Sequence, residues 1–255
     1  MGKVCSLPVW GVFAWFAVAA APAAMAQFRA LDSGPLPPGT RSGSFEIAQH
    51  GHEVGTASFQ FKKTADGIDS TSLVKVQMEG LDFALSKNEQ LTAANELSHV
   101  QLSATVNGEA VNIVAKPDAA QFLMNISAQG KSSTTRLAAH KYAVFMPDFD
   151  PGALQTLLAL AVAQNSRDLW AILPKEAGSI EPVQVATYPD QQGTLDGKQI
   201  TVHHLVSTIA GASTDLFSGP ENQLLQAELP QQGFALVRKG FVLVPPAKPE
   251  APRSE

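Results

Sequence analysis

The residues best suited to chemistry are His50, His52 and Glu53, which lie together in an expected turn. Imidazole and carboxylate groups are ligands that zinc uses, and the two histidines could share one side of the chain. A zinc site normally needs three or four protein ligands, and no spacing in the sequence identifies the others. We therefore predict no metal site here, with these three residues as weak candidates and solvated polar side chains as the alternative.

Other catalytic patterns are missing from the sequence. There is no G-x-S-x-G motif and no glycine-rich phosphate loop, and the single cysteine, Cys5, lies near the N-terminus. Asp148 and Asp150 flank Phe149 and could form a carboxylate pair, but Asp150 is better placed to cap a helix. We predict a protein that is not an enzyme and has no cofactor. A metal-dependent hydrolase is the competing alternative.

A set of large apolar residues suggests a different activity, the binding of an acyl chain or another apolar guest. Curved antiparallel sheets often carry ligands in their concavity, although the same pattern is needed merely to build a core. The candidate ligand-binding residues are Phe45, Phe59, Phe61, Phe83, Phe122, Met124 and Trp170.

The elements that must position these residues are mostly strands. Apolar residues recur at every second position, as half-buried strands require. Asn107-Gly108 and Asp196-Gly197 have the residues that tight hairpin turns favour, and Asp66-Gly67 marks a further turn. The sequence thus predicts a mainly β fold, a curved antiparallel meander that forms a half-barrel or a barrel-like sheet. Expected strands include residues 57–62, 74–78, 100–106, 111–115, 122–128, 183–187, 200–208, 224–229 and 234–238.

One segment, near residues 151–165, breaks the pattern and predicts a covering helix. Its apolar residues are three and four positions apart, Asp150 can cap it, and Pro151 suits its first turn. We expect the apolar face of this helix to plug the concave side of the sheet. The alternative is a mobile lid over a ligand cavity.

The two ends of the chain are predicted to lie outside this domain. Residues 1–26 have the pattern of a secretory signal peptide, with Lys3 before an apolar run and a small-residue cleavage sequence at residues 24–26. Residues 27–40 are expected to be a disordered linker, and residues 245–255 a disordered Pro-rich tail. The antiparallel β domain would span residues 41–244, and the mature protein would be periplasmic or secreted.

Charge limits the classes of partner. The formal net charge is −5, and no stretch of the mature chain gathers several Lys or Arg residues, which argues against nucleic acid. No second apolar run approaches the length of a membrane span, so we expect no transmembrane segment in the mature chain. The oligomeric state is left open.

Two parts of the sequence carry a resemblance. Residues 43–47 and 51–57 have the form of a strand, turn and strand, and residues 222–230 with 234–238 have the form of closing strands. Across residues 41–241 the chain resembles an uncharacterised family of bacterial periplasmic β proteins, remotely similar to the half-barrels of lipoprotein carriers. The resemblance implies a curved sheet with a covering helix and a lipid or lipoprotein ligand, and it implies no catalytic residue.

These observations favour a non-enzymatic exported envelope protein that binds a lipid, an acyl chain or another apolar ligand in its curved sheet. A structural or protein-interaction domain without a small ligand is the second interpretation. An open apolar cavity would favour the first, and a filled core with an exposed apolar patch would favour the second.

Overall fold

The computed structural model describes residues 41–175 and 178–245. The predicted signal peptide, the predicted linker and all but the first residue of the predicted tail lie outside the described residues. Strands run from Arg41 to Val244. No helix within the described ranges is long and apolar enough to cross a membrane.

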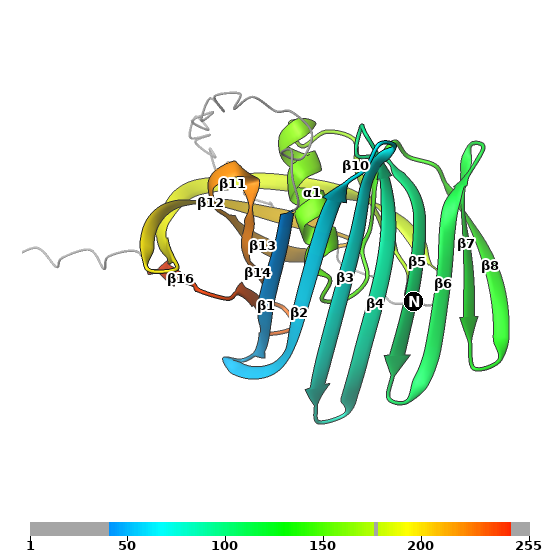
Figure 1. Cartoon of the computed structure of the whole chain (residues 1–255), viewed down its shortest axis with the longest axis horizontal. Helices are drawn as coiled ribbons and strands as arrows, with labels where there is room; N and C mark the ends of the chain where they lie inside the picture. The colour runs from blue at the N-terminus through cyan, green and yellow to red at the C-terminus, as the bar shows by residue number, and fades with distance from the viewer. Residues whose placement is uncertain (1–40, 176–177, 246–255) are drawn as a thin grey trace, which may run out of the picture. The chain divides into compact units, whose positions relative to one another are not determined.

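The fold is mainly β, as predicted, with one α-helix and a short 3-10 turn among the described residues (Figure 1). The elements are β1 (Arg41–Gln49), β2 (His52–Lys63), β3 (Gly67–Met78), β4 (Leu81–Thr92), β5 (Leu97–Val106), β6 (Glu109–Asp118), β7 (Gln121–Ala128), β8 (Lys131–Ala138), β9 (Tyr142–Phe145), α1 (Pro151–Ala163), β10 (Leu169–Leu173), β11 (Ser179–Leu195), β12 (Lys198–Ile209), β13 (Ala212–Ser218), η1 (Pro220–Asn222), β14 (Leu224–Leu229), β15 (Phe234–Arg238) and β16 (Phe241–Val244).

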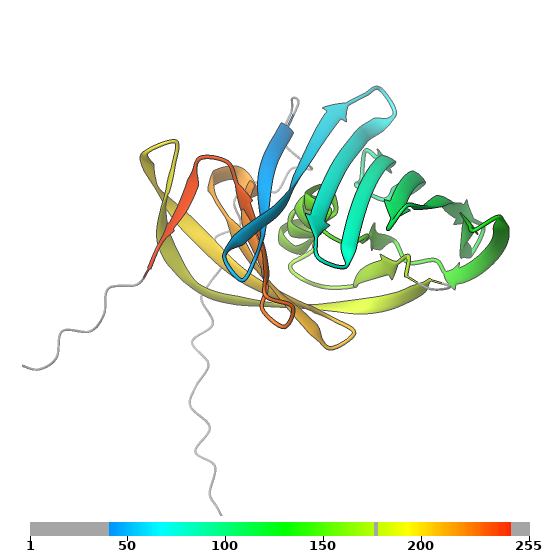
Figure 2. The same cartoon turned by 90° about the horizontal axis from the view of Figure 1, so that it is seen from below.

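All the strands belong to one 16-stranded sheet, in the order β8-β7-β6-β5-β4-β3-β2-β1-β15-β14-β13-β12-β11-β10-β9, with β16 paired to β11. Neighbours are antiparallel except β9 and β10, which are parallel and are joined through α1. The chain thus builds two meanders that meet where β1 pairs with β15. The sheet curls but does not close into a barrel, because β8 and β9 end the paired order (Figure 2).

Turn chemistry fixes the register of the hairpins. At both Asn107-Gly108 and Asp196-Gly197 the two residues have positive φ, which is the backbone that a two-residue hairpin turn requires. These turns join β5 to β6 and β11 to β12, so both hairpin predictions are confirmed.

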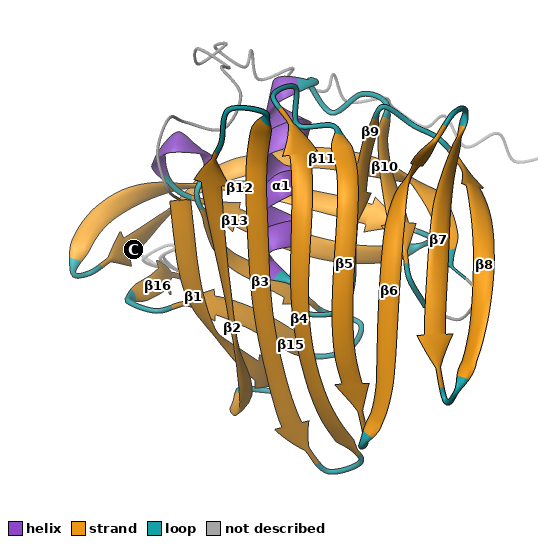
Figure 3. Ribbon diagram, turned by 45° about the vertical axis from the view of Figure 1, so that its right-hand side comes forward, coloured by secondary structure: helices purple, strands orange, loops and turns teal. Residues whose placement is uncertain are grey.

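The long strands bury every second side chain on the concave side of the sheet. In β3 the alternation of buried and exposed residues is almost unbroken. The buried side chains form one main core around α1, which lies across the concave side behind β3 and β4 (Figure 3). A smaller core contains Val202, Phe217, Leu225 and Phe241, from the strands near β16.

The helix begins where the sequence predicts it. Asp150 is its N-cap, with Oδ1 accepting from the backbone N–H groups of Gly152 (2.8 Å) and Ala153 (3.2 Å). The helix ends at Ala163, two residues earlier than predicted. Asn165 and Ser166 have left-handed backbone conformations, which cannot continue a right-handed helix.

Candidate functional site

The predicted ligand-binding residues lie in the main core. The rings of Phe45 and Phe59 are 6.0 Å apart, and those of Phe59 and Phe61 are 5.1 Å apart. All six of the predicted residues other than Trp170 are buried, and Trp170 is partly buried and stacks on His140 at 3.6 Å. The phenylalanines of β1 and β2 therefore form one cluster, whereas Phe83, Phe122, Met124 and Trp170 come from other parts of the sheet.

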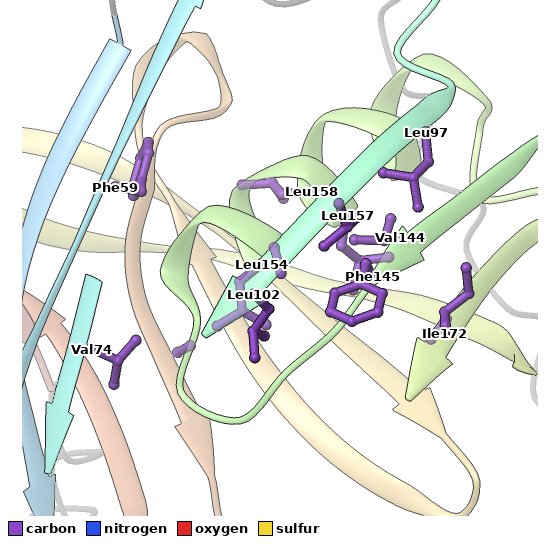
Figure 4. Close-up of a cluster of buried hydrophobic side chains, with 14 of the residues drawn as sticks. Phe59, Val74, Leu97, Leu102, Val144, Phe145, Leu154, Leu157, Leu158 and Ile172 are labelled. Carbon is purple, nitrogen blue, oxygen red and sulfur yellow. The ribbon is translucent and has the colours of Figure 1, made fainter. Parts of the chain in front are cut away.

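Helix α1 fills the space that a ligand would need. Ten of its 13 residues are buried, on nearly every side of the helix. Leu154, Leu157 and Leu158 face apolar side chains from several strands, among them Phe59, Val74 and Leu102 (Figure 4). The concave side of the sheet is therefore apolar and is occupied by α1, as expected for a helix that plugs it.

A charged cluster, here defined as Lys87, Glu89 and Asp150, lies inside this apolar region. The Nζ atom of Lys87 is 2.5 Å from Oε2 of Glu89 and 2.6 Å from Oδ2 of Asp150. None of the three side chains is more than 1% exposed. Lys87 and Glu89 point inward from β4, whereas Asp150 is the cap of α1, so the cluster ties the helix to the sheet.

Two serine hydroxyls lie beside the charged cluster. Ser70 and Ser72 of β3 are directly opposite Glu89 and Lys87 in the register, and both are buried. Neither hydroxyl has a hydrogen-bond partner within the described part of the chain. A Cβ atom at Gly152 would collide with Oγ of Ser72, so this hydroxyl faces the first turn of the helix. The helix can approach so closely because residue 152 has no side chain.

The electrostatics of the charged cluster follow from one cation facing two carboxyl groups. Burial alone would lower the pKa of Lys87, but attraction to Asp150 and Glu89 outweighs it and raises this pKa to about 12. Burial raises the pKa of Glu89 despite the attraction of Lys87. Lys87 is therefore held as a cation, and Glu89 is a carboxyl group that takes up a proton more readily than a solvated one.

A second polar contact holds α1 farther along its length. The buried side-chain amide of Gln155 donates to the carbonyl of Asn222 and accepts from the N–H of Leu224, both at 2.8 Å. These contacts connect the helix to η1 and β14, in the meander that does not contain Lys87. Both halves of the sheet thus bind the helix through buried polar groups.

The outer face of β1–β6 has a groove of about 710 Å³. Its outward-facing side chains are mostly small or polar, with Leu73 exposed by 58%. Lys75 and Lys239 also line the groove. Phe45 is among the residues that line the groove, but it is fully buried and packs in the core with Phe59 and Phe61, on the opposite face of the sheet.

The weak metal candidates do not converge with other ligands. His50, His52 and Glu53 are exposed at the β1–β2 turn, where the ring of His50 lies against Gly233. Across residues 41–175 and 178–245, no group of three His, Cys, Asp or Glu residues could hold a metal ion.

Two histidine–aspartate pairs occur instead in the second meander. His203 is hydrogen-bonded to Asp190 at 2.9 Å, and His204 to Asp215 at 2.7 Å. The ring of His204 also stacks on Phe217 at 4.6 Å. Adjacent residues of a strand face opposite sides of the sheet, so the two pairs are separate and do not form one site.

Sequence reasoning missed the charged cluster, although a signal for it exists. Residues 83, 85, 87, 89 and 91 alternate toward the core, and two of these positions carry Lys87 and Glu89 in place of apolar residues. Two charges at consecutive inward positions of a strand would have predicted a buried ion pair.

Comparison of the chain with protein-family models, with curated proteins and with solved structures finds no match.

Proposed function

We propose that the protein is a non-enzymatic, exported protein of the bacterial envelope that binds an acyl chain or another apolar guest on the concave side of its sheet. The concave side is filled by α1, so binding of a guest requires this helix to move away from the sheet. The observation that carries the proposal is that, among the described residues, one helix alone covers the apolar face. A guest that displaces α1 would meet Phe59, Val74 and Leu102, together with Phe45 and Phe61 of the predicted set.

The charged contacts that hold α1 against the sheet support the proposal that this helix moves away when a guest binds. A buried ion pair adds little stability compared with apolar side chains of the same size, because desolvation offsets the attraction. A helix that served only as a core element would be held as well by apolar contacts. The charged cluster is therefore better explained as a contact that fixes the position of α1 each time the helix packs back onto the sheet.

The direct test is native mass spectrometry with lipid extraction on the protein purified from a bacterial envelope. We expect a stoichiometric acyl lipid. Absence of lipid, together with no binding of added 1-dodecanol, would contradict the proposal. The matched control is Leu73→Ser on the outer face, which should leave the amount of bound lipid unchanged.

A second candidate function is favoured by the outer groove. With exposed Leu73 between small side chains and with Lys75 and Lys239 along it, the groove fits a protein segment that carries Asp or Glu residues. Under this function the chain is a protein-interaction domain without a small ligand. Leu73→Ser combined with Lys75→Ser would then abolish partner binding, and no lipid would be extracted from the unmodified protein.

A further inference from the structure

The charged cluster contains a carboxylate that does not belong to the sheet. Asp150 comes from the cap of α1, and its Oδ2 atom lies 2.6 Å from Nζ of Lys87. If α1 is displaced, Lys87 loses this carboxylate and keeps only Glu89. A lysine that remains among apolar side chains requires a second anion to replace the one that left.

The two serine hydroxyls add donors to the same place. Ser70 and Ser72 are buried without hydrogen-bond partners among the described residues, although buried polar groups are normally paired. Ser72 faces the first turn of α1, close to Gly152. When the helix is displaced, this hydroxyl would face the emptied space and could donate to an oxygen of a guest.

The space beside this polar site is long and apolar. Helix α1 has 13 residues, which corresponds to about 20 Å at 1.5 Å per residue. The charged cluster lies at the N-terminal end of the helix, because Asp150 is the N-cap. Leu154, Leu157 and Leu158 follow along the helix (Figure 4). An amphiphile with an anionic head and an extended apolar chain has the same order of groups as Asp150 followed by the helix.

We propose that the guest is a fatty acid whose carboxylate takes the place of Asp150 on Lys87, while its hydrocarbon chain takes the place of α1. This inference rests on the proposed function and specifies its ligand class. The exchange replaces one carboxylate by another, so the site keeps one cation and two carboxyl groups. Ser70 and Ser72 supply hydroxyl donors to the head group.

The test compares two guests that differ only in the head group, dodecanoate and 1-dodecanol. Their dissociation constants are measured by isothermal titration calorimetry on the purified full-length chain after removal of lipid. We expect dodecanoate to bind roughly tenfold more tightly, as a charge-assisted contact in a dry site provides. Glu89→Gln should increase this preference, because Lys87 is then no longer shared with a second carboxyl group of the sheet.

Two further variants locate the effect. Lys87→Met should reduce the preference for dodecanoate to about one, and Lys62→Met, on the exposed side of β2, should leave it unchanged. Lys87→Met also removes the partner of two buried carboxyl groups. If it fails to fold, the increased preference of Glu89→Gln carries the test, since misfolding cannot produce a gain.

The possible outcomes distinguish the binding of a fatty-acid carboxylate at Lys87 from the more general proposal that the protein binds an apolar guest. Equal binding of both guests to the unmodified protein, with no change in Glu89→Gln, would overturn the carboxylate assignment and leave apolar-guest binding in place. Binding of neither guest would overturn both.

Discussion

Two polar clusters of similar geometry lie in very different surroundings. Lys87 and Asp150 are 2.6 Å apart with no solvent contact, and His204 and Asp215 are 2.7 Å apart with side chains that are 14% and 24% exposed. If one partner of the second pair is removed, water can reach the other. If one partner of the first pair is removed, the other stays buried. Burial, and not distance, therefore decides what each contact contributes.

The largest expected effect comes from breaking the buried cluster. Lys87→Met leaves the carboxyl groups of Glu89 and Asp150 buried without a cation, so we expect the free energy of unfolding to fall by about 3–5 kcal/mol. Urea unfolding measures this change. Lys62→Met on the exposed side of β2 is the control, expected within about 0.5 kcal/mol.

A triple variant distinguishes the loss of a partner from the loss of the cluster. Lys87→Met, Glu89→Leu and Asp150→Asn together remove all three charges and keep a side chain able to cap α1. We expect its stability to equal or exceed that of the parent, by up to about 4 kcal/mol. A triple variant as unstable as Lys87→Met would show that the charged cluster is needed for folding, and it would weaken the argument for a helix that leaves.

The next effect is a loss of stability at high pH. The pKa of Lys87 is about 12 in the folded protein, above its ordinary value of 10.5, so the folded state keeps this proton longer than the unfolded state. The stability gained from the ion pairs is complete below pH 10.5 and is lost as pH rises through 12. We expect the loss to be about 2 kcal/mol, from the size of the pKa difference.

The measurement is the free energy of unfolding between pH 9 and pH 12, with the parent and Lys87→Met compared at each pH. The difference between the two proteins should shrink as Lys87 loses its proton. A constant difference across this range would mean that Lys87 is not held as a cation by its two carboxyl partners.

The fold was predictable where local chemistry determines it. Period two in the strands, positive φ at Asn107-Gly108 and Asp196-Gly197, and the cap Asp150 each act over a few residues, and each prediction is confirmed. Strand β4 was not predicted, because Lys87 and Glu89 interrupt its apolar alternation. The pairing of β1 with β15 depends on long-range contacts, which one sequence does not display.

The candidate site was predictable only in part. Phe45, Phe59 and Phe61 were found because apolar residues on the concave side follow the strand period. Asp150 was assigned correctly as a cap, but its second role requires Lys87 to lie beside the start of α1, far away in sequence. The Lys87–Glu89 pair leaves a local signal in the inward alternation of β4, but the contact of Lys87 with Asp150 joins distant segments and appears only in three dimensions.

A smaller change in stability distinguishes the two roles of Asp150, which caps α1 and forms an ion pair with Lys87. Asp150→Asn and Asp150→Ala both remove the charge beside Lys87, but only Asn keeps an oxygen that can accept from Gly152 and Ala153. We expect Asp150→Ala to be less stable than Asp150→Asn by about 1 kcal/mol, the usual contribution of an N-cap. Urea unfolding of both variants gives this difference. Equal stabilities would mean that Asp150 acts only through Lys87.

The smallest effects are expected at the histidine–aspartate pairs. They test whether solvent exposure determines how much stability is lost when one partner of a polar pair is removed. Asp215→Ala removes the partner of the half-buried His204 and should cost about 1 kcal/mol. Asp190→Ala removes the partner of His203, in a pair with side chains that are 41% and 53% exposed, and should stay within about 0.5 kcal/mol. Urea unfolding ranks the two variants with Lys87→Met. If Asp190→Ala cost as much as Asp215→Ala, solvent access would not explain why the buried cluster differs from these pairs, since the bond lengths are nearly the same in all three.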